Sequence, residues 1–253
     1  MDRKAIRRWL RRVWVTCGLG LTAWLAWNLQ ARGVPAAVLV SSDTVQVHAE
    51  ESVTIFLPAG GSPDAIGLIF LPGGGVDPAA YLPVVRRVAD AGIHAALVEL
   101  PYRMAFSNAS RDEVWQRVMR VRTRWGGKRP VVLAGHSRGA ALAAAFADRH
   151  AAELGGLMLI ATTHPRDHDL SRATLPVVKI MGTLDCVAPL DDARANGARL
   201  PAGTQWVEIA GANHAQFGYY GSQINDCRAT ISREDQQRQL HTAIVASLAQ
   251  MGR

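Results

Sequence analysis

The sequence has no internal repeat and no low-complexity tract, which excludes a repeat architecture. Excess positive charge is also small outside the N-terminus. The formal net charge is +7, but six basic residues against Asp2 place +5 of it in the first twelve positions and leave +2 elsewhere. No nucleic-acid-binding module accompanies this charge, so we expect no nucleic-acid partner. The apolar share of 49% over 253 residues is sufficient for one globular domain with a short appendage.

Charged residues are absent between Val13 and Leu29. As a helix, this run would span about 25 Å, which is just long enough to cross a bilayer. Tryptophans lie near both ends of the run, as in the aromatic belts at membrane interfaces: Trp9, Trp14, Trp24 and Trp27. We therefore predict a basic cytoplasmic segment over residues 1–12 and a transmembrane signal anchor over residues 13–31, with the membrane as a partner. The positive-inside rule then places the rest of the chain outside the cytoplasm, which is the periplasm in a Gram-negative bacterium.

A cleaved signal peptide is the alternative interpretation of the N-terminus. Ala31 and the pair Ala36-Ala37 offer small residues near a plausible cleavage point, and cleavage would release a secreted domain. Both interpretations export the remainder of the chain.

Cysteine usage agrees with export. Of the three cysteines, Cys17 falls in the apolar run, which leaves Cys186 and Cys227 for the exported part. Such a pair predicts a disulfide, and two unpaired thiols that merely pack are the alternative. A bridge would close a loop of 41 positions.

The chain after a linker at residues 32–43 is predicted to form one domain over residues 44–253. Residues 44–50 and 52–57 are β-rich and nearly adjacent, which suggests an antiparallel hairpin. Short apolar runs typical of buried parallel strands follow at 66–71, 94–100, 131–135, 156–161 and 177–181, with a final strand at 205–209. Helical patterns lie at 79–91, 113–125, 138–150 and 233–250. This alternation predicts an α/β fold with a mostly parallel sheet covered on both faces.

The pentapeptide Gly135-His136-Ser137-Arg138-Gly139 lies between a predicted strand and a predicted helix. Gly-x-Ser-x-Gly is a weak signal alone, but a strand-to-helix turn needs small residues at both flanks and exposes the serine hydroxyl at the carboxyl edge of the sheet. We therefore predict Ser137 as a nucleophile.

A serine hydroxyl needs a base, and that base needs an orienting acid. His214 follows the last strand and is the predicted base. His164 and His168 share a loop, but no further metal ligands accompany them and we expect no metal. Asp185 follows the strand at 177–181 and is the predicted acid.

Other groups complete the predicted site. Asp191 and Asp192 are weaker candidates for the acid, because they resemble first-turn residues of a helix. An oxyanion hole needs backbone N–H donors, and the amide of Arg138 is one candidate. The turn Pro72-Gly73-Gly74-Gly75 offers the second donor through Gly74 or Gly75, without discrimination between them.

Together these motifs make residues 44–250 resemble the α/β-hydrolase superfamily, in particular its small lidless branch similar to dienelactone hydrolases. The stretch from Gly211 to Gly218, followed by Tyr220-Gly221-Ser222-Gln223, is similar to the histidine region of that branch. The resemblance implies a Ser137-His214-Asp185 triad and hydrolysis of a carboxylic ester or related acyl bond in a small-molecule substrate, without a metal or organic cofactor. Dienelactone hydrolases proper use a cysteine nucleophile, so their substrate is not carried over.

The fourteen or so residues between the strands at 156–161 and 177–181 leave no room for a large lid. We expect a substrate pocket with contributions from Tyr102, Phe217 and Tyr220. The same residues would also serve an acyltransferase or a peptidase, and a non-catalytic binding protein on this fold is a further alternative. The sequence does not indicate an oligomeric state.

Overall fold

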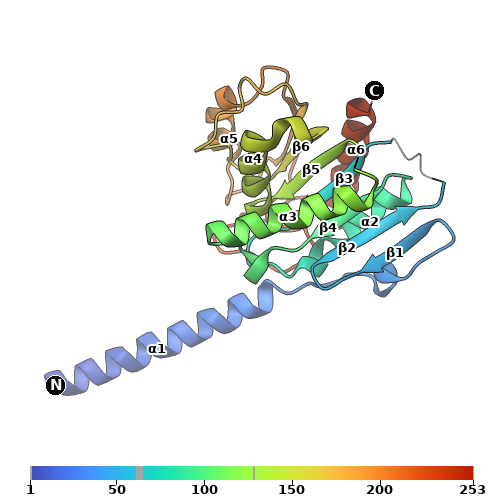
Figure 1. The fold of residues 1–253 in the computed structure, drawn as a ribbon. Coiled ribbons are helices and arrows are strands. Elements are labelled where there is room, and N and C mark those ends of the chain that lie inside the picture. Colours follow the sequence, from blue (N-terminus) through green and yellow to red (C-terminus); the bar gives the residue numbers. More distant parts are fainter. Residues whose placement is uncertain (1, 61–64, 128, 253) are drawn as a thin grey trace.

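The computed structural model, which describes residues 2–60, 65–127 and 129–252, is built around one eight-stranded sheet (Figure 1). The strand order is β1-β2-β4-β3-β5-β6-β7-β8. The strands are β1 Val45–Ala49, β2 Val53–Pro58, β3 Gly67–Leu71, β4 Ala95–Val98, β5 Val131–His136, β6 Gly156–Ile160, β7 Val177–Gly182 and β8 Gln205–Ile209. Strands β1 and β2 form the predicted antiparallel hairpin, β2 pairs antiparallel with β4, and the remaining neighbours are parallel. The predicted mostly parallel α/β sheet is confirmed.

Two apolar clusters cover the two faces of the sheet, because successive side chains of a strand point to opposite faces. On β3, for example, Leu68 and Phe70 belong to one cluster, and Ile69 and Leu71 to the other. Helices α2 and α6 pack on the first face, and α3 and α4 on the second. The helices are α1 Arg3–Asn28, α2 Leu82–Asp90, α3 Asn108–Arg124, α4 Arg138–His150, α5 Leu190–Ala195 and α6 Arg233–Met251.

Two helices differ from their predicted bounds for local reasons. Helix α3 begins five residues before the predicted position 113, because Ser107 and Ser110 form a reciprocal capping box at its start. The stretch predicted as one helix over 79–91 divides into a 3₁₀ turn, Pro78–Tyr81, followed by α2. The predicted linker also contains a 3₁₀ turn, Ala36–Leu39, whose Val38 is buried in the domain.

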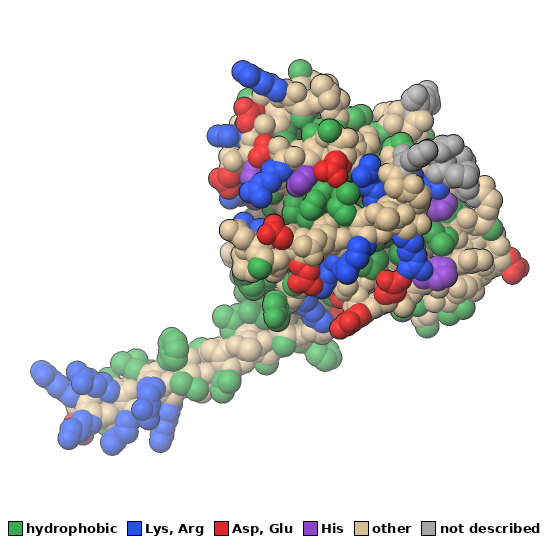
Figure 2. All heavy atoms as spheres, viewed as in Figure 1, with side chains coloured by type: hydrophobic (Ala, Val, Ile, Leu, Met, Phe, Trp, Pro, Cys, Tyr) green, Lys and Arg blue, Asp and Glu red, His purple; other side chains and the backbone are tan. Residues whose placement is uncertain are grey.

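Helix α1 extends away from the sheet domain (Figure 1), with basic side chains at its far end and apolar ones along its length (Figure 2). Its tryptophans are exposed, at 78% for Trp14 and 70% for Trp27. Among the described helices, none combines the length and apolar character that a bilayer crossing requires. The predicted transmembrane helix is therefore not supported. The uncharged run is interrupted by polar and small residues, among them Thr16, Gly18 and Thr22, which lower its mean hydropathy.

Candidate active site

Ser137 occupies a strained turn between β5 and α4. Its φ of 52° and ψ of −113° are rare for a residue with a side chain. Both flanking glycines are required by close approach. A Cβ on Gly135 would lie 2.3 Å from the carbonyl carbon of Gly139, and a Cβ on Gly139 would lie 2.2 Å from the carbonyl oxygen of Leu71. The turn therefore has the geometry that presents a nucleophile at the carboxyl edge of a parallel sheet.

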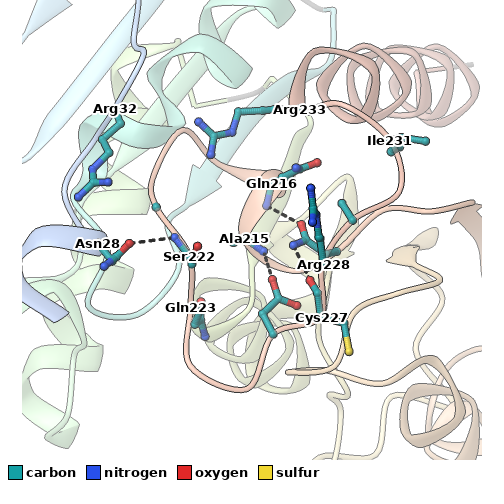
Figure 3. A pocket seen from close by; sticks show the side chains of 14 residues that line it. Asn28, Arg32, Ala215, Gln216, Ser222, Gln223, Cys227, Arg228, Ile231 and Arg233 are labelled. Atoms are coloured by element: carbon teal, nitrogen blue, oxygen red, sulfur yellow. Dashed lines mark hydrogen bonds between the residues drawn. The ribbon is translucent and has the colours of Figure 1, made fainter. Parts of the chain in front are cut away.

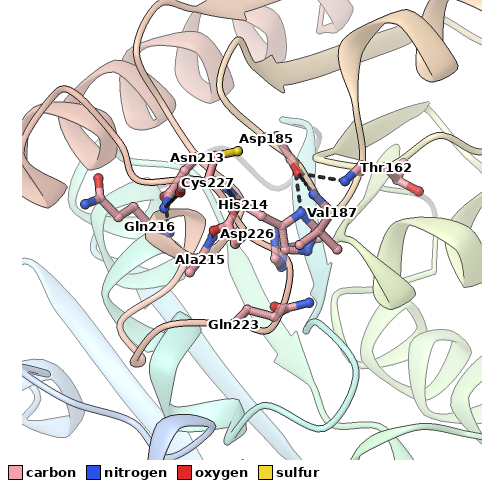
Figure 4. Close-up of polar contacts among 12 residues, drawn as sticks. Thr162, Asp185, Val187, Asn213, His214, Ala215, Gln216, Gln223, Asp226 and Cys227 are labelled. Atoms are coloured by element: carbon pink, nitrogen blue, oxygen red, sulfur yellow. Dashed lines mark hydrogen bonds and ion pairs between the residues drawn. The ribbon is translucent and has the colours of Figure 1, made fainter.

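Asp185 and His214 meet beside this edge, although 29 positions separate them (Figure 4). The Oδ2 atom of Asp185 lies 2.8 Å from Nδ1 of His214, and both side chains are buried. The other carboxylate oxygen accepts hydrogen bonds from the backbone N–H groups of Val187 (2.9 Å) and Ala188 (2.7 Å). Because these bonds fix the carboxylate, it orients the imidazole and leaves Nε2 as the basic atom.

A second carboxylate holds the backbone of the same histidine. Asp226 accepts hydrogen bonds from the N–H groups of His214 (3.2 Å) and Ala215 (2.9 Å). Burial is the main cause of a raised pKa at Asp226. Cys186 and Cys227, each next in sequence to one of the two aspartates, form a disulfide with a Cα separation of 5.3 Å, as predicted. The loops carrying Asp185 and Asp226 are therefore covalently joined.

His136 lies behind the catalytic candidates, with its ring centroid 4.6 Å from that of His214. Its Nδ1 atom is 2.8 Å from the hydroxyl oxygen of Tyr81. Burial, reinforced by the neighbouring His214, lowers the pKa of His136 well below its usual range, so the ring is neutral. Within the described residues, Nε2 of His214 has no hydrogen-bond partner, and Ser137 is not hydrogen-bonded to it. Catalytic hydrogen bonds are often long in the free state of enzymes and tighten when substrate binds.

The glycine turn after β3 discriminates between the two predicted oxyanion donors. The N–H of Gly75 donates to the carbonyl of Arg103 at 2.8 Å and is therefore occupied. Gly74 instead lies against the residue after Ser137, because a Cβ on it would be 3.0 Å from Cβ of Arg138. Arg138 is the first residue of α4, so its N–H has no partner within the helix. The geometry favours the amides of Gly74 and Arg138 over that of Gly75.

The segment after β4 completes this side of the site. Tyr102, Arg103 and Ala105 all have positive φ, at 53°, 56° and 51°. The guanidinium of Arg138 stabilises this strained conformation by donating to the carbonyls of Met104 and Ala105, both at 3.0 Å. Strained backbone of this kind gathers at functional sites.

Burial separates the three residues predicted to contact substrate. Tyr102 is 90% exposed on the strained segment, so it is available to a ligand. Phe217 and Tyr220 are both 0% exposed, which corrects their predicted place in a substrate pocket. Phe217 packs 5.8 Å from the ring of His136, and Tyr220 packs 6.3 Å from that of Tyr81. Their aromatic rings support the site from the core.

Two charged residues near the site, the buried Lys179 and the half-buried Asp226, were not singled out from the sequence. Lys179 stands within the apolar run Val177-Val178-Lys179-Ile180-Met181, and that interruption is a visible signal. Its ammonium donates to the carbonyls of Thr162 (2.5 Å) and His164 (2.8 Å), which holds the loop after β6. Burial lowers the pKa of Lys179 to about 7. Asp226 is the second, and its signal is the repeated Asp-Cys pair.

The other acidic and histidine candidates from the sequence lie at positions that are explained without a catalytic or metal-binding role. Asp191 and Asp192 lie in the first turn of α5, as expected of carboxylates at a helix start. His168 pairs with Asp148 at 2.9 Å. Burial lowers the pKa of His164 to about 4. No cluster of metal-ligating side chains occurs in the described part of the chain.

These features define the class of protein. A model of the alpha/beta hydrolase family matches residues 67–238, and the chain belongs to that family. No curated protein matches the sequence significantly.

Solved structures share the fold. An alpha-beta serine hydrolase homologue from Coxiella burnetii is 15% identical, with a TM-score of 0.58 over 83% of this chain and 99% of the other. Thermogutta terrifontis esterase 2 is 18% identical, with a TM-score of 0.59 over 88% and 98%. A membrane phospholipase A described as a bacterial virulence factor is 16% identical, with a TM-score of 0.55 over 95% and 99%.

Proposed function

We propose that this protein is a serine hydrolase that cleaves a carboxylic ester or a related acyl bond through Ser137, His214 and Asp185. The observation that carries the proposal is the buried 2.8 Å contact between Asp185 and His214 beside the strained serine turn. A binding protein on the same fold would gain nothing from a buried carboxylate and imidazole pair whose second ring nitrogen has no partner among the described residues.

In the proposed reaction, Nε2 of His214 takes the proton of Ser137 as Oγ attacks the acyl carbon. Asp185 stabilises the imidazolium that forms, and the N–H groups of Gly74 and Arg138 stabilise the oxyanion. The imidazolium returns its proton to the leaving alcohol, which departs and leaves an acyl-serine. Water, deprotonated by His214, then releases the acid and regenerates the serine.

A fluorophosphonate probe tests the nucleophile. It should label the wild type and the variant Ser171→Ala, which removes an exposed serine that is not part of the proposed triad, but not Ser137→Ala. If the folded Ser137→Ala variant is labelled as strongly as wild type, or the folded wild type is not labelled, the assignment is wrong. A panel of p-nitrophenyl esters and amides of graded chain length then separates esterase from peptidase activity.

The alcohol or acyl group of the substrate is proposed to contact Tyr102, which stands exposed beside the glycine turn. Tyr102→Ala should raise KM for the preferred ester by several-fold. An unchanged KM and substrate preference would remove Tyr102 from the proposed pocket.

We also propose that the hydrolase domain works outside the cytoplasm and that α1 associates with a membrane surface. The exposed Cys186–Cys227 disulfide supports export, because such bridges persist in oxidising compartments. The exposed apolar side chains and basic end of α1 support interfacial contact. A C-terminal alkaline phosphatase fusion should be active, and an inactive fusion produced at normal levels would contradict export.

A further inference from the structure

A cavity of about 660 Å³ lies on the side of the histidine loop where α1 joins the domain (Figure 3). Its walls come from the end of α1, from loop residues next to His214, from residues 221–231 and from the first residue of α6. Asn213, Ala215 and Gln216 line it, whereas Ser137 and Asp185 do not. It is therefore a separate cavity that shares one loop with the candidate active site.

The cavity is strongly cationic. Arg32, Arg228 and Arg233 reach it from three different segments, and Figure 3 shows their side chains around the opening. The carboxylate in its wall is Asp226, whose two oxygens already accept the backbone N–H groups at positions 214 and 215. None of the three arginines forms an ion pair with a carboxylate among the described residues. The positive charge is thus left for a ligand.

Two of the guanidinium groups are held in place but keep donors free. Arg32 donates to the carbonyl of Trp27 at 2.5 Å and lies 4.6 Å from the centre of its ring. Arg233 donates to the carbonyl of Tyr220 at 2.6 Å. A guanidinium carries five N–H donors, so one bond each leaves most of them available. The Nε atom of Arg233 is buried without a partner among the described residues.

One residue of the cavity wall, Gln216, carries an unpaired neutral acceptor. Oε1 of Gln216 is buried and has no hydrogen-bond partner among the described residues. A buried acceptor of this kind favours a ligand that brings a hydroxyl donor. Free guanidinium donors favour a phosphate group, whose oxygens they bind in a fork.

We propose that this cavity binds a phosphate ester that carries at least one free hydroxyl group, such as a polyol phosphate. Arg32, Arg228 and Arg233 bind the phosphate, and Gln216 accepts a hydroxyl. The same chemistry is found in a soluble sugar or glycerol phosphate and in the glycerol phosphate headgroup of an anionic phospholipid. The end of α1 forms part of the cavity wall, so a headgroup would be bound where the proposed membrane-contacting helix meets the domain.

Calorimetric titration with glycerol 3-phosphate and with inorganic phosphate tests the ligand chemistry in the full chain. Arg228→Gln is the main variant, because Arg228 is exposed and its side chain forms no ion pair among the described residues. Arg149→Gln is the matched control, an exposed arginine on α4 that is not part of the cavity. We expect Arg228→Gln to weaken glycerol 3-phosphate binding about tenfold and Arg149→Gln to leave it unchanged. Gln216→Met should remove the preference for glycerol 3-phosphate over inorganic phosphate.

Co-sedimentation with vesicles distinguishes the two sources of the phosphate. The ligand is a lipid headgroup if Arg228→Gln binds phosphatidylglycerol vesicles more weakly than Arg149→Gln and neither variant binds phosphatidylcholine vesicles. The ligand is a soluble polyol phosphate if the two variants bind vesicles equally but Arg228→Gln binds glycerol 3-phosphate more weakly than Arg149→Gln. If neither measurement separates Arg228→Gln from Arg149→Gln, the cavity is not a phosphate site. Fluorophosphonate labelling of Ser137 is independent of all these readouts, so failure of this proposal is distinct from failure of the proposed hydrolase activity.

Discussion

Removal of the Cys186–Cys227 disulfide should destabilise the domain and disturb its catalytic candidates together. The bridge closes a loop of 41 positions. In the chain-entropy treatment, a loop of this length reduces the entropy of the unfolded chain by about 13 cal/mol/K, which stabilises the fold by about 4 kcal/mol at 25 °C. The double variant Cys186→Ala/Cys227→Ala should therefore unfold at a urea concentration about 1 to 2 M lower than wild type, for a slope of about 2 to 3 kcal/mol/M.

The same bridge lies next to both carboxylates that hold the base. Asp185 contacts the imidazole of His214 and Asp226 contacts its backbone N–H, and each is followed in sequence by a bridging cysteine. Loss of the bridge frees the two loops to move independently, so kcat should fall, by up to about a hundredfold for a displacement near 1 Å. Both cysteines are exposed, so reductant added to the wild type should reproduce the effect.

Urea unfolding followed by tryptophan fluorescence, and ester hydrolysis in the absence of urea, measure the two effects. Cys17→Ala is the control, because Cys17 is a free and exposed thiol on α1 and its removal should change neither quantity. A double variant whose unfolding midpoint lies within about 0.3 M of wild type, with an unchanged slope, would refute the reasoning from loop entropy.

Three further predictions concern single positions. Gly139→Ala should destabilise the fold by more than about 3 kcal/mol, because the added Cβ would lie 2.2 Å from the Leu71 carbonyl oxygen. Gly203→Ala is the control, since its Cβ would meet no atom within 4 Å and the change should be tolerated. Equal melting temperatures of the two variants would contradict this prediction. Asp185→Asn should lower kcat about 10⁴-fold with little change in thermal stability, because an amide favours the wrong tautomer of its imidazole partner. Steady-state kinetics and calorimetric scans measure the two quantities. Burial lowers the pKa of Lys179 from 10.5 to about 7, so between these values the folded chain binds fewer protons there than the unfolded chain. The free energy of unfolding should accordingly rise with pH over that window more steeply in wild type than in Lys179→Met, and parallel urea-derived profiles would contradict it.

The strands and the serine turn could be predicted because their signals are local. An apolar run between turn residues identifies a buried strand, and Gly135 and Gly139 flank Ser137 within five positions. The order Ser137, Asp185, His214 along the chain gave the acid and base by their places after β7 and β8. The contacts that brace them could not be predicted in the same way. Asp226 reaches the backbone of His214 across twelve positions that contain no strand or α-helix, so no periodicity identifies it.

Aromatic residues show the limit of local signals most clearly. Phe217 and Tyr220 follow His214 by three and six positions, and both were predicted to contact substrate. The chain after His214 instead forms a 3₁₀ turn, Ala215–Phe217, that directs Phe217 into the core, where it packs against His136. Tyr102, far from His214 in sequence, is the exposed ring. Exposure depends on the direction in which each turn aims its side chains, and distance along the chain does not determine it.

The N-terminal helix was predicted to span a membrane from its uncharged length and its tryptophans, and neither criterion measures how apolar the run is. Absence of charged side chains over Val13 to Leu29 permits membrane insertion, but insertion also requires enough apolar surface to offset the polar groups of the run. Glycine and threonine contribute little such surface, and Trp14 and Trp27 are side chains that settle at interfaces. The same features favour a helix whose apolar side chains meet the surface of a bilayer while its basic end meets anionic headgroups. Such a helix would bring the arginine-lined cavity at its base close to the headgroup layer, so the membrane contact and the phosphate site would act at the same surface.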